Sequence, residues 1–90
     1  GRIENVYTLQ TMNTEEQGHR YKVTVDGLPD AEIVDSPEVD VPAATLQSFN
    51  AVVRVQPDAG KKGANQIHFE IVALDNPDIK VREKASFLLP

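Results

Sequence analysis

The stretch Gln66-Ile67-His68-Phe69-Glu70-Ile71 decides the fold class of this chain. Its apolar residues Ile67, Phe69 and Ile71 alternate with polar ones, and a period of two places all three on one face of an extended strand. The same alternation recurs over residues 20–25 and 48–56. Strands with one dry face and one wet face are typical of antiparallel sheets, so we expect a small antiparallel β domain.

Length and composition limit what else the chain can be. Its 90 residues suffice for one domain, residues 1–90, with one hydrophobic core. The chain has no cysteine, which excludes disulfides and thiolate metal sites. Nine basic against fourteen acidic residues give a net charge of −5, which argues against a nucleic-acid partner. The chain starts at Gly1 rather than Met, so we expect a fragment of a longer protein.

Turn-forming residues divide the chain into about seven short strands. We expect turns at Gly27-Leu28-Pro29-Asp30 and at Asp75-Asn76-Pro77-Asp78, because these residue types favour turn conformations. Pro37 and Pro42 bracket a short segment and mark it as an edge or connecting strand. The expected strands cover residues 3–12, 19–26, 31–35, 38–41, 47–56, 65–74 and 79–88.

Alternation in the first strand is imperfect. Val6 and Met12 are out of phase with Tyr7 and Leu9. This mismatch predicts either a bulge near Gln10-Thr11 or burial of the strand on both faces.

Strands of this number and spacing are typical of an immunoglobulin-like antiparallel β-sandwich. The inward residues are mostly Val, Ile and Leu, whose size suits interdigitation between two sheets. The paired cysteines and the tryptophan of antibody domains are absent, so the wider sandwich class is expected. The predicted core consists of Tyr7, Leu9, Tyr21, Val23, Val25, Phe49, Val53, Val55, Ile67, Phe69, Ile71 and Val81.

Two histidines are the side chains that titrate near neutral pH. We interpret His19 and His68 as solvated surface residues, because His19 follows a turn and His68 falls on the polar face of its strand. A competing hypothesis is a copper carrier that binds the ion through His19, His68 and Met12.

Carboxylates occur in three pairs, and each pair lies in or beside an expected turn. In such positions the side chain commonly bonds to its own backbone, whereas acid–base catalysis needs a partly desolvated cleft. A calcium site at Asp75, Asn76 and Asp78 is the alternative for one pair, but Pro77 and the lack of a bidentate glutamate argue against it. The pairs are Glu15-Glu16, Asp30 with Glu32, and Asp75 with Asp78.

Nucleophile and phosphate motifs are missing. Ser36, Ser48 and Ser86 have no Gly-x-Ser-x-Gly context, and the stretch Asp58-Ala59-Gly60-Lys61-Lys62-Gly63 lacks the spacing of a phosphate-binding loop. We therefore assign no catalytic, cofactor-binding or metal residue, and we expect this domain not to be an enzyme.

Three cationic residues alternate along one face of the last strand: Lys80, Arg82 and Lys84. One interpretation is a patch for an acidic partner or for lipid headgroups. The interpretation that we favour is a solvated or edge strand, which positive charge protects from aggregation.

Several segments together resemble a known family. The block Glu4-Asn5-Val6-Tyr7-x-Leu9-x-x-Met12-Asn13 is the most specific, and residues 35–65 are generic. His19-Arg20-Tyr21, Gly27-Leu28-Pro29 and the ending over residues 83–90 add to it. Over essentially its whole length the chain resembles the C-terminal domain of the FixG/CcoG (RdxA-like) proteins, accessory factors for cbb(3)-type cytochrome c oxidase.

The resemblance implies a parent protein and a place for this domain in it. The parent would be a bacterial inner-membrane redox protein, with transmembrane helices and two iron–sulfur clusters held by cysteines. It would assist oxidase maturation through copper handling and reduction. This chain has none of those cysteines, so no cofactor is expected in it.

The domain would lie on the periplasmic side of the membrane and be tethered through the missing N-terminal part. It would be a non-catalytic module that docks an assembly partner or the parent's own membrane part. A structural cap that stabilises the parent or its oligomer is the alternative. The resemblance also implies a further strand-like stretch before Asn5-Val6-Tyr7, and without it an unpaired edge at the chain start would allow dimerisation.

Overall fold

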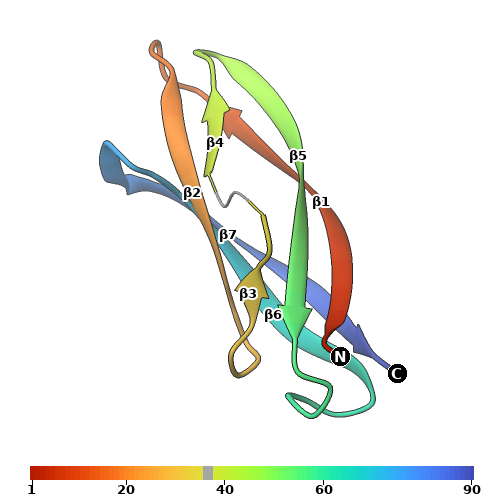
Figure 1. Cartoon of the computed structure of the whole chain (residues 1–90). Helices are drawn as coiled ribbons and strands as arrows, with labels where there is room; N and C mark the ends of the chain where they lie inside the picture. The colour runs from red at the N-terminus through yellow and green to blue at the C-terminus, as the bar shows by residue number, and fades with distance from the viewer. Residues whose placement is uncertain (36–37) are drawn as a thin grey trace.

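The computed structural model describes residues 1–35 and 38–90, which form seven β-strands and no helix. The strands pair antiparallel in two sheets, with the orders β1-β5-β3 and β4-β2-β6-β7 (Figure 1). The expected antiparallel β-sandwich of seven strands is confirmed. The strands are β1 (Ile3–Asn13), β2 (His19–Asp26), β3 (Glu32–Ile33), β4 (Glu38–Val41), β5 (Thr45–Val55), β6 (Gly63–Ala73) and β7 (Asn76–Leu89).

The chain changes sheets between β3 and β4. β3 pairs with β5 in one sheet, and β4 pairs with β2 in the other. Ser36 and Pro37, named above as a possible nucleophile and a strand boundary, lie outside the described residues. Both termini lie at one end of the elongated molecule, which measures 44 × 20 × 17 Å (Figure 1).

The hydrophobic core lies between the two sheets, and most of its members were predicted. Tyr7, Val25 and Phe49 are half-buried against it, and the Tyr7 ring packs edge-to-face on Phe69 with 5.1 Å between the centroids. The predicted core left out five buried members, which are Val41, Ala51, Ala73, Phe87 and Leu89. The predicted residues that are buried are Leu9, Tyr21, Val23, Val53, Val55, Ile67, Phe69 and Ile71.

The prediction that Val81 belongs to the core is wrong, since its side chain is 46% exposed. Val81 pairs with the buried Ile71 and therefore faces the inner side of its sheet. However, the hydrogen bonds that join β1 to β7 fall near the end of β7, at Ser86 and Leu88. Near Val81, the inner face of the four-stranded sheet therefore extends beyond the part that β1 covers.

Both predictions for the first strand are also wrong. β1 pairs with β5 in unbroken register from Ile3–Val55 to Asn13–Thr45, without a bulge. Val6 and Met12 are 69% and 52% exposed, so the strand is not buried on both faces either. Alternation misled because polar residues, Thr11 and Asn13, occupy the last inward positions.

Hydrogen bonds explain how Asn13 tolerates complete burial. Its side-chain amide donates to the carbonyls of Gln17 and Val41 at 2.9 and 3.1 Å, and its Oδ1 accepts from the N–H of Glu15 at 2.9 Å. The amide thereby closes the β1–β2 turn onto β4, and its desolvation is offset by three bonds.

The irregular position lies instead in β7. Ala73 pairs with Asn76 and the adjacent Val72 pairs with Lys80, which leaves residues 77–79 as extra residues on β7. Pro77 fits there because a bulge does not require its missing N–H. The expected four-residue turn is accordingly shorter, since Leu74 and Asp75 alone are turn residues.

The expected turn after β2 is present. Gly27 has a φ of +116°, and a Cβ atom there would lie 2.7 Å from the carbonyl oxygen of Gln66. Only glycine meets both conditions without displacement of β6.

Candidate interaction surface

The residues of the copper hypothesis do not converge. His19 lies on the inner side of β2, with its side chain 2% exposed, whereas His68 lies on the outer face of the same sheet beside Asp26. Met12 lies on the outer face of the other sheet. Among residues 1–35 and 38–90, no three His, Cys, Asp or Glu side chains group as metal ligands.

The interpretation of His19 as a solvated residue is wrong. Its Nδ1 lies 2.7 and 2.9 Å from the two carboxylate oxygens of Asp75, and its ring packs edge-on against Tyr21. Its buried Nε2 has no hydrogen-bond partner in the described part of the chain. The signal was present in the sequence, because His19 is in phase with the inward Tyr21 and Val23.

The three carboxylate pairs found in the sequence lie in turns, bond to neighbouring groups or face solvent. Asp75 bonds to His19, and Asn76 Oδ1 accepts from the N–H of Asp78 at 3.2 Å, so the proposed calcium ligands are turned to other partners. Glu32 pairs with Arg2 and Arg54, and Asp30 occupies a turn at φ 57°. Glu15 and Glu16 lie exposed at the β1–β2 turn.

The two outer faces differ in charge. On the four-stranded sheet, Arg20 makes a two-bond contact with Asp40 at 2.9 and 3.2 Å, and that hydrogen bonding lowers the pKa of Asp40. On the three-stranded sheet, the middle of the outer face, formed by β1 and β5, carries no charged side chain. Its outward residues are Val6, Thr8, Gln10 and Met12 of β1 and Leu46, Ser48, Asn50 and Val52 of β5.

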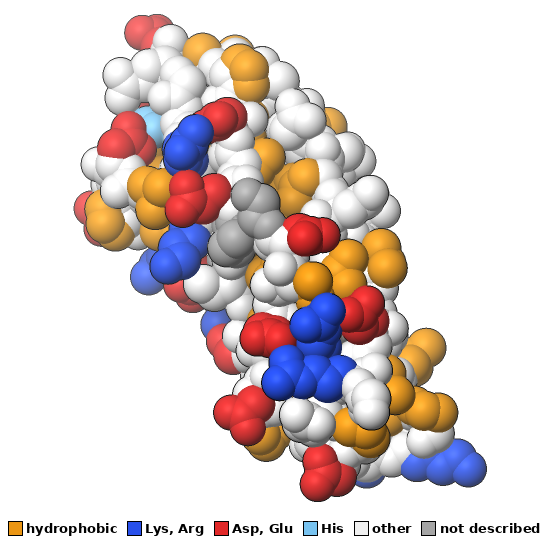
Figure 2. Space-filling model, viewed as in Figure 1, with side chains coloured by type: hydrophobic (Ala, Val, Ile, Leu, Met, Phe, Trp, Pro, Cys, Tyr) orange, Lys and Arg blue, Asp and Glu red, His pale blue; other side chains and the backbone are white. Residues whose placement is uncertain are grey.

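Several side chains on this uncharged face are apolar and solvent-exposed. Val6, Met12 and Leu46 are 69%, 52% and 57% exposed. In the space-filling view, hydrophobic surface lies along the side of the molecule that β1 and β5 occupy (Figure 2). Charged side chains of both signs lie beside one another in other parts of the view, and one such pair, Glu4 of β1 with Arg54 of β5, lies at an end of these same strands.

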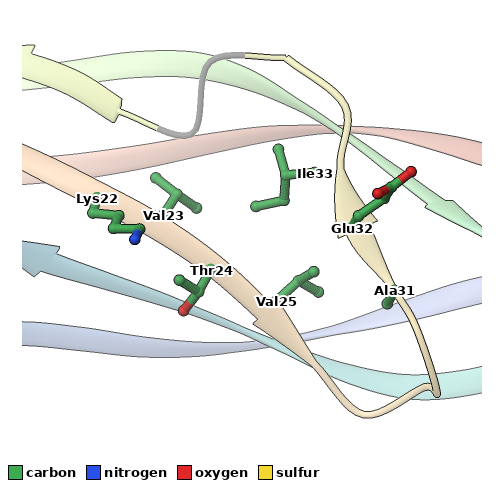
Figure 3. Close-up of a pocket in the computed structure, with 7 residues that line it drawn as sticks. All are labelled: Lys22, Val23, Thr24, Val25, Ala31, Glu32 and Ile33. Atoms are coloured by element: carbon green, nitrogen blue, oxygen red, sulfur yellow. The ribbon is translucent and has the colours of Figure 1, made fainter.

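A groove of about 290 Å³ opens between β2 and β3 (Figure 3). It forms because β4 covers β2 only as far as Lys22, while β3 has just two residues. Val23, Val25 and Ile33 line it and point into the gap between the strands. These side chains could make van der Waals contacts with a ligand, and the strands could offer backbone groups, but no acid and base converge in the groove.

The longest strand forms an edge of the four-stranded sheet. β7 pairs with β6 along one side, and side chains of β1 reach the other side at only two of its residues in the described structure. The Asn5 amide bonds to both backbone groups of Leu88, and the Tyr7 hydroxyl donates to the Ser86 carbonyl at 2.8 Å. The expectation that the cationic strand is an edge strand is therefore confirmed.

Charge along this edge is only partly compensated. Arg82 makes a two-bond contact with Asp26 at 3.0 and 3.2 Å and lies 3.7 Å from Glu70. Lys80 and Lys84 form no ion pair with any described residue. We name the segment from Lys80 to Lys84 the cationic edge.

Fold and surface together define the class of this protein. Two antiparallel sheets packed face to face, with an exposed edge, make it an immunoglobulin-like β-sandwich domain. A family model of the Ig-like fold at the C-terminus of FixG, itself described as a candidate oxidoreductase, matches residues 1–90. The chain belongs to this family of FixG C-terminal domains, as the resemblance implied.

A solved structure agrees with this assignment. The crystal structure of a FixG-related protein from Vibrio parahaemolyticus is similar to this chain, with a TM-score of 0.84, 22% identity, and coverage of 97% of this chain and 79% of the other. At that identity the similarity concerns the fold. No curated protein matches the chain. Within the described residues no helix is long and apolar enough to cross a membrane.

Proposed function

We propose that this domain is a non-catalytic interaction module of a membrane-bound iron–sulfur redox protein that assists assembly of cbb(3)-type cytochrome c oxidase. It would lie on the periplasmic side of the bacterial inner membrane and dock a protein partner of oxidase assembly. Membership in the FixG family supports this parentage. Copper handling and reduction would be tasks of the parent, because this chain has no cysteine to hold a cluster.

The observation that carries the proposal is the edge of β7. A 14-residue strand at the margin of a sheet leaves a row of backbone groups available to another chain. Two of its lysines form no ion pair among the described residues, although the chain as a whole is acidic. Such a surface suits recognition of another protein.

Deletion of this domain from the full-length parent tests the proposal. We expect that the truncated parent accumulates normally, fails to retain its assembly partner in a pull-down, and supports less oxidase maturation. Unchanged partner binding together with unchanged maturation would rule out docking. Immunoblots of the parent provide the abundance control.

A structural cap is the second candidate, and the uncharged face favours it. Exposed Val6, Met12 and Leu46 could be covered by the parent's own membrane part or by its oligomer. In that case deletion lowers the abundance of the parent while its specific activity stays intact. The double change Val6→Lys and Leu46→Lys would then reproduce the loss of abundance, whereas Thr8→Lys and Asn50→Lys would have a smaller effect.

A further inference from the structure

We propose that the cationic edge is a strand-addition site for an extended, acidic segment of a partner protein. This inference rests on the proposed function, and it names the surface and the chemistry of the partner. The added strand would pair with the backbone of Lys80, Arg82 and Lys84 on the side of β7 that faces away from β6.

Contacts at the other end of β7 show which backbone groups face outward. The side-chain Oδ1 of Asn5 accepts from the N–H of Leu88 at 3.2 Å, and its Nδ2 donates to the Leu88 carbonyl at 3.3 Å. Both groups of Leu88 therefore point away from β6. Because this direction alternates along an antiparallel strand, the groups of Lys80, Arg82 and Lys84 point the same way.

These outward groups have no hydrogen-bond partner on that side among residues 1–35 and 38–90. A side-chain amide has the same donor and acceptor as a peptide group, so Asn5 satisfies the edge at Leu88 as a neighbouring strand would. The cationic edge continues the same row beyond the reach of β1. A partner strand would supply there what Asn5 supplies at Leu88.

Charge determines the kind of segment that fits. The side chains of Lys80 and Lys84 lie on the outer face of the sheet, where residues of an added strand would lie directly opposite them. Carboxylates at alternate positions of that strand would pair with these two lysines. Arg82 is already held by Asp26 and Glu70, so it needs no further acidic partner.

Exposed apolar surface determines the intervening positions. Val81 faces the inner side of the sheet and is 46% exposed, and Ile79 is half-buried beside it. An apolar residue between two carboxylates of the added strand would cover Val81. The cationic edge covers five residues, which span about 17 Å at about 3.3 Å per residue, so a segment of acidic and apolar residues in alternation is long enough at about seven residues.

A second copy of this chain fits the site poorly. Two β7 strands that pair antiparallel about Arg82 would place Lys80 of one copy opposite Lys84 of the other. Like charges at directly opposite positions destabilise such a pair. Lysines on an edge thus hinder self-association and leave the edge open to a strand of the opposite charge.

Binding of a synthetic peptide to the isotope-labelled 90-residue chain tests the proposal. The probe is blocked Glu-Val-Glu-Thr-Glu-Val-Glu. We expect it to shift the backbone amide resonances of residues 79–85 and to slow hydrogen exchange at Lys80, Arg82 and Lys84. A version N-methylated at every peptide bond has no backbone N–H to donate to the edge, and we expect it to bind about tenfold more weakly or worse.

Matched variants separate charge at the edge from charge in general. Lys80→Glu with Lys84→Glu should weaken peptide binding about tenfold or more, whereas Lys61→Glu with Lys62→Glu changes the net charge equally and should leave it unchanged. Lys84→Pro should weaken binding more than Lys84→Gln. Proline removes an outward N–H while keeping the ladder to β6 intact.

Four results would overturn strand addition. One is equal binding of the N-methylated peptide, which would indicate charge attraction alone, and another is a shift map centred on the β2–β3 groove. A third is binding to vesicles containing phosphatidylglycerol, dependent on the two lysines, without any peptide-induced shift, since this indicates a lipid surface. The fourth is self-association that Lys80→Glu with Lys84→Glu alters, again without peptide binding.

The two proposals fail differently. If the peptide does not bind but deletion in the parent abolishes partner retention, the docking function stands and the cationic edge is not its site. If the peptide binds as expected but deletion changes neither partner retention nor maturation, strand addition stands and the proposed function falls.

Discussion

The imidazole of His19 and the carboxylate of Asp75 join the first residue of β2 to the β6–β7 turn, with Nδ1 lying 2.7 and 2.9 Å from the two oxygens. The histidine is buried and the carboxylate is half exposed, so this contact fixes a solvent-facing turn to the core. The ring nitrogen that faces the carboxylate acts as the donor when the imidazole is neutral.

Removal of one member of this pair should cost more than removal of both. Asp75→Ala leaves the buried Nδ1–H of His19 without its partner, and we expect the free energy of unfolding to fall by about 1–3 kcal/mol. His19→Phe keeps an aromatic ring and has no donor to satisfy. Urea unfolding of the two single variants and the double variant measures the coupling. An equal effect of Asp75→Ala with and without His19 would refute it.

Asn13 should be the most sensitive polar residue at the β1–β2 end. Asn13→Ala removes three hydrogen bonds, and it leaves the buried carbonyl of Val41 and the backbone groups of Glu15 and Gln17 without this partner. We expect a loss of about 2–4 kcal/mol in the free energy of unfolding. Asn50→Ala, on the exposed face of β5, should change it by no more than about 0.5 kcal/mol and serves as the control.

The two tyrosines should make the fold sensitive to alkali. Burial raises the pKa of Tyr7, and burial followed by the charges of Glu15 and Asp75 raises the pKa of Tyr21. Both pKa values lie above the ordinary tyrosine value of 10.0, so folding favours the neutral form. Their contribution to stability is complete below about pH 10 and is lost as pH rises through the folded pKa values.

Ultraviolet titration of tyrosinate in the folded and the urea-unfolded chain measures this difference. We expect a higher midpoint for the folded chain and a decline of its unfolding free energy above about pH 10. A folded midpoint equal to or below the unfolded one would contradict the prediction.

Copper should find no joint site at His19, His68 and Met12. His19 is buried on the inner side of its sheet, whereas His68 and Met12 lie on the outer faces of different sheets, so no single ion can contact all three. We expect calorimetry with copper ions at micromolar chain concentration to show no binding heat that depends on all three residues. The single variants that test this are His19→Phe, His68→Gln and Met12→Leu. Loss of a binding isotherm in each of the three variants would restore the carrier hypothesis.

Alternation predicted the strands well because it reflects a direct physical requirement, one dry face for each strand. With the turn residues that follow it, alternation predicted β2 at its observed bounds, and the flanking prolines predicted β4 at its observed bounds. Alternation failed where the inward residue was polar: Thr11, Asn13 and His19 are buried through local packing or hydrogen bonds that residue type alone does not indicate.

The candidate site was only partly predictable from the sequence. The cationic alternation of Lys80, Arg82 and Lys84 was visible, and so was its character as an edge. The sequence could not indicate where β1 stops covering β7, because that depends on how the two sheets cross. Val81 was misplaced for the same reason, and the bulge at residues 77–79 depends on the β6 register.

The location of both chain ends at one end of the sandwich has a mechanical consequence (Figure 1). Tension applied to Ile3 and Leu89 would act first on the outermost pairs, Ile3–Val55 and Gly63–Leu89. The ladders would then peel open one rung at a time rather than shear together. Resistance to pulling would therefore be low, and the bridge from Asn5 to Leu88 would be among the earliest contacts to break.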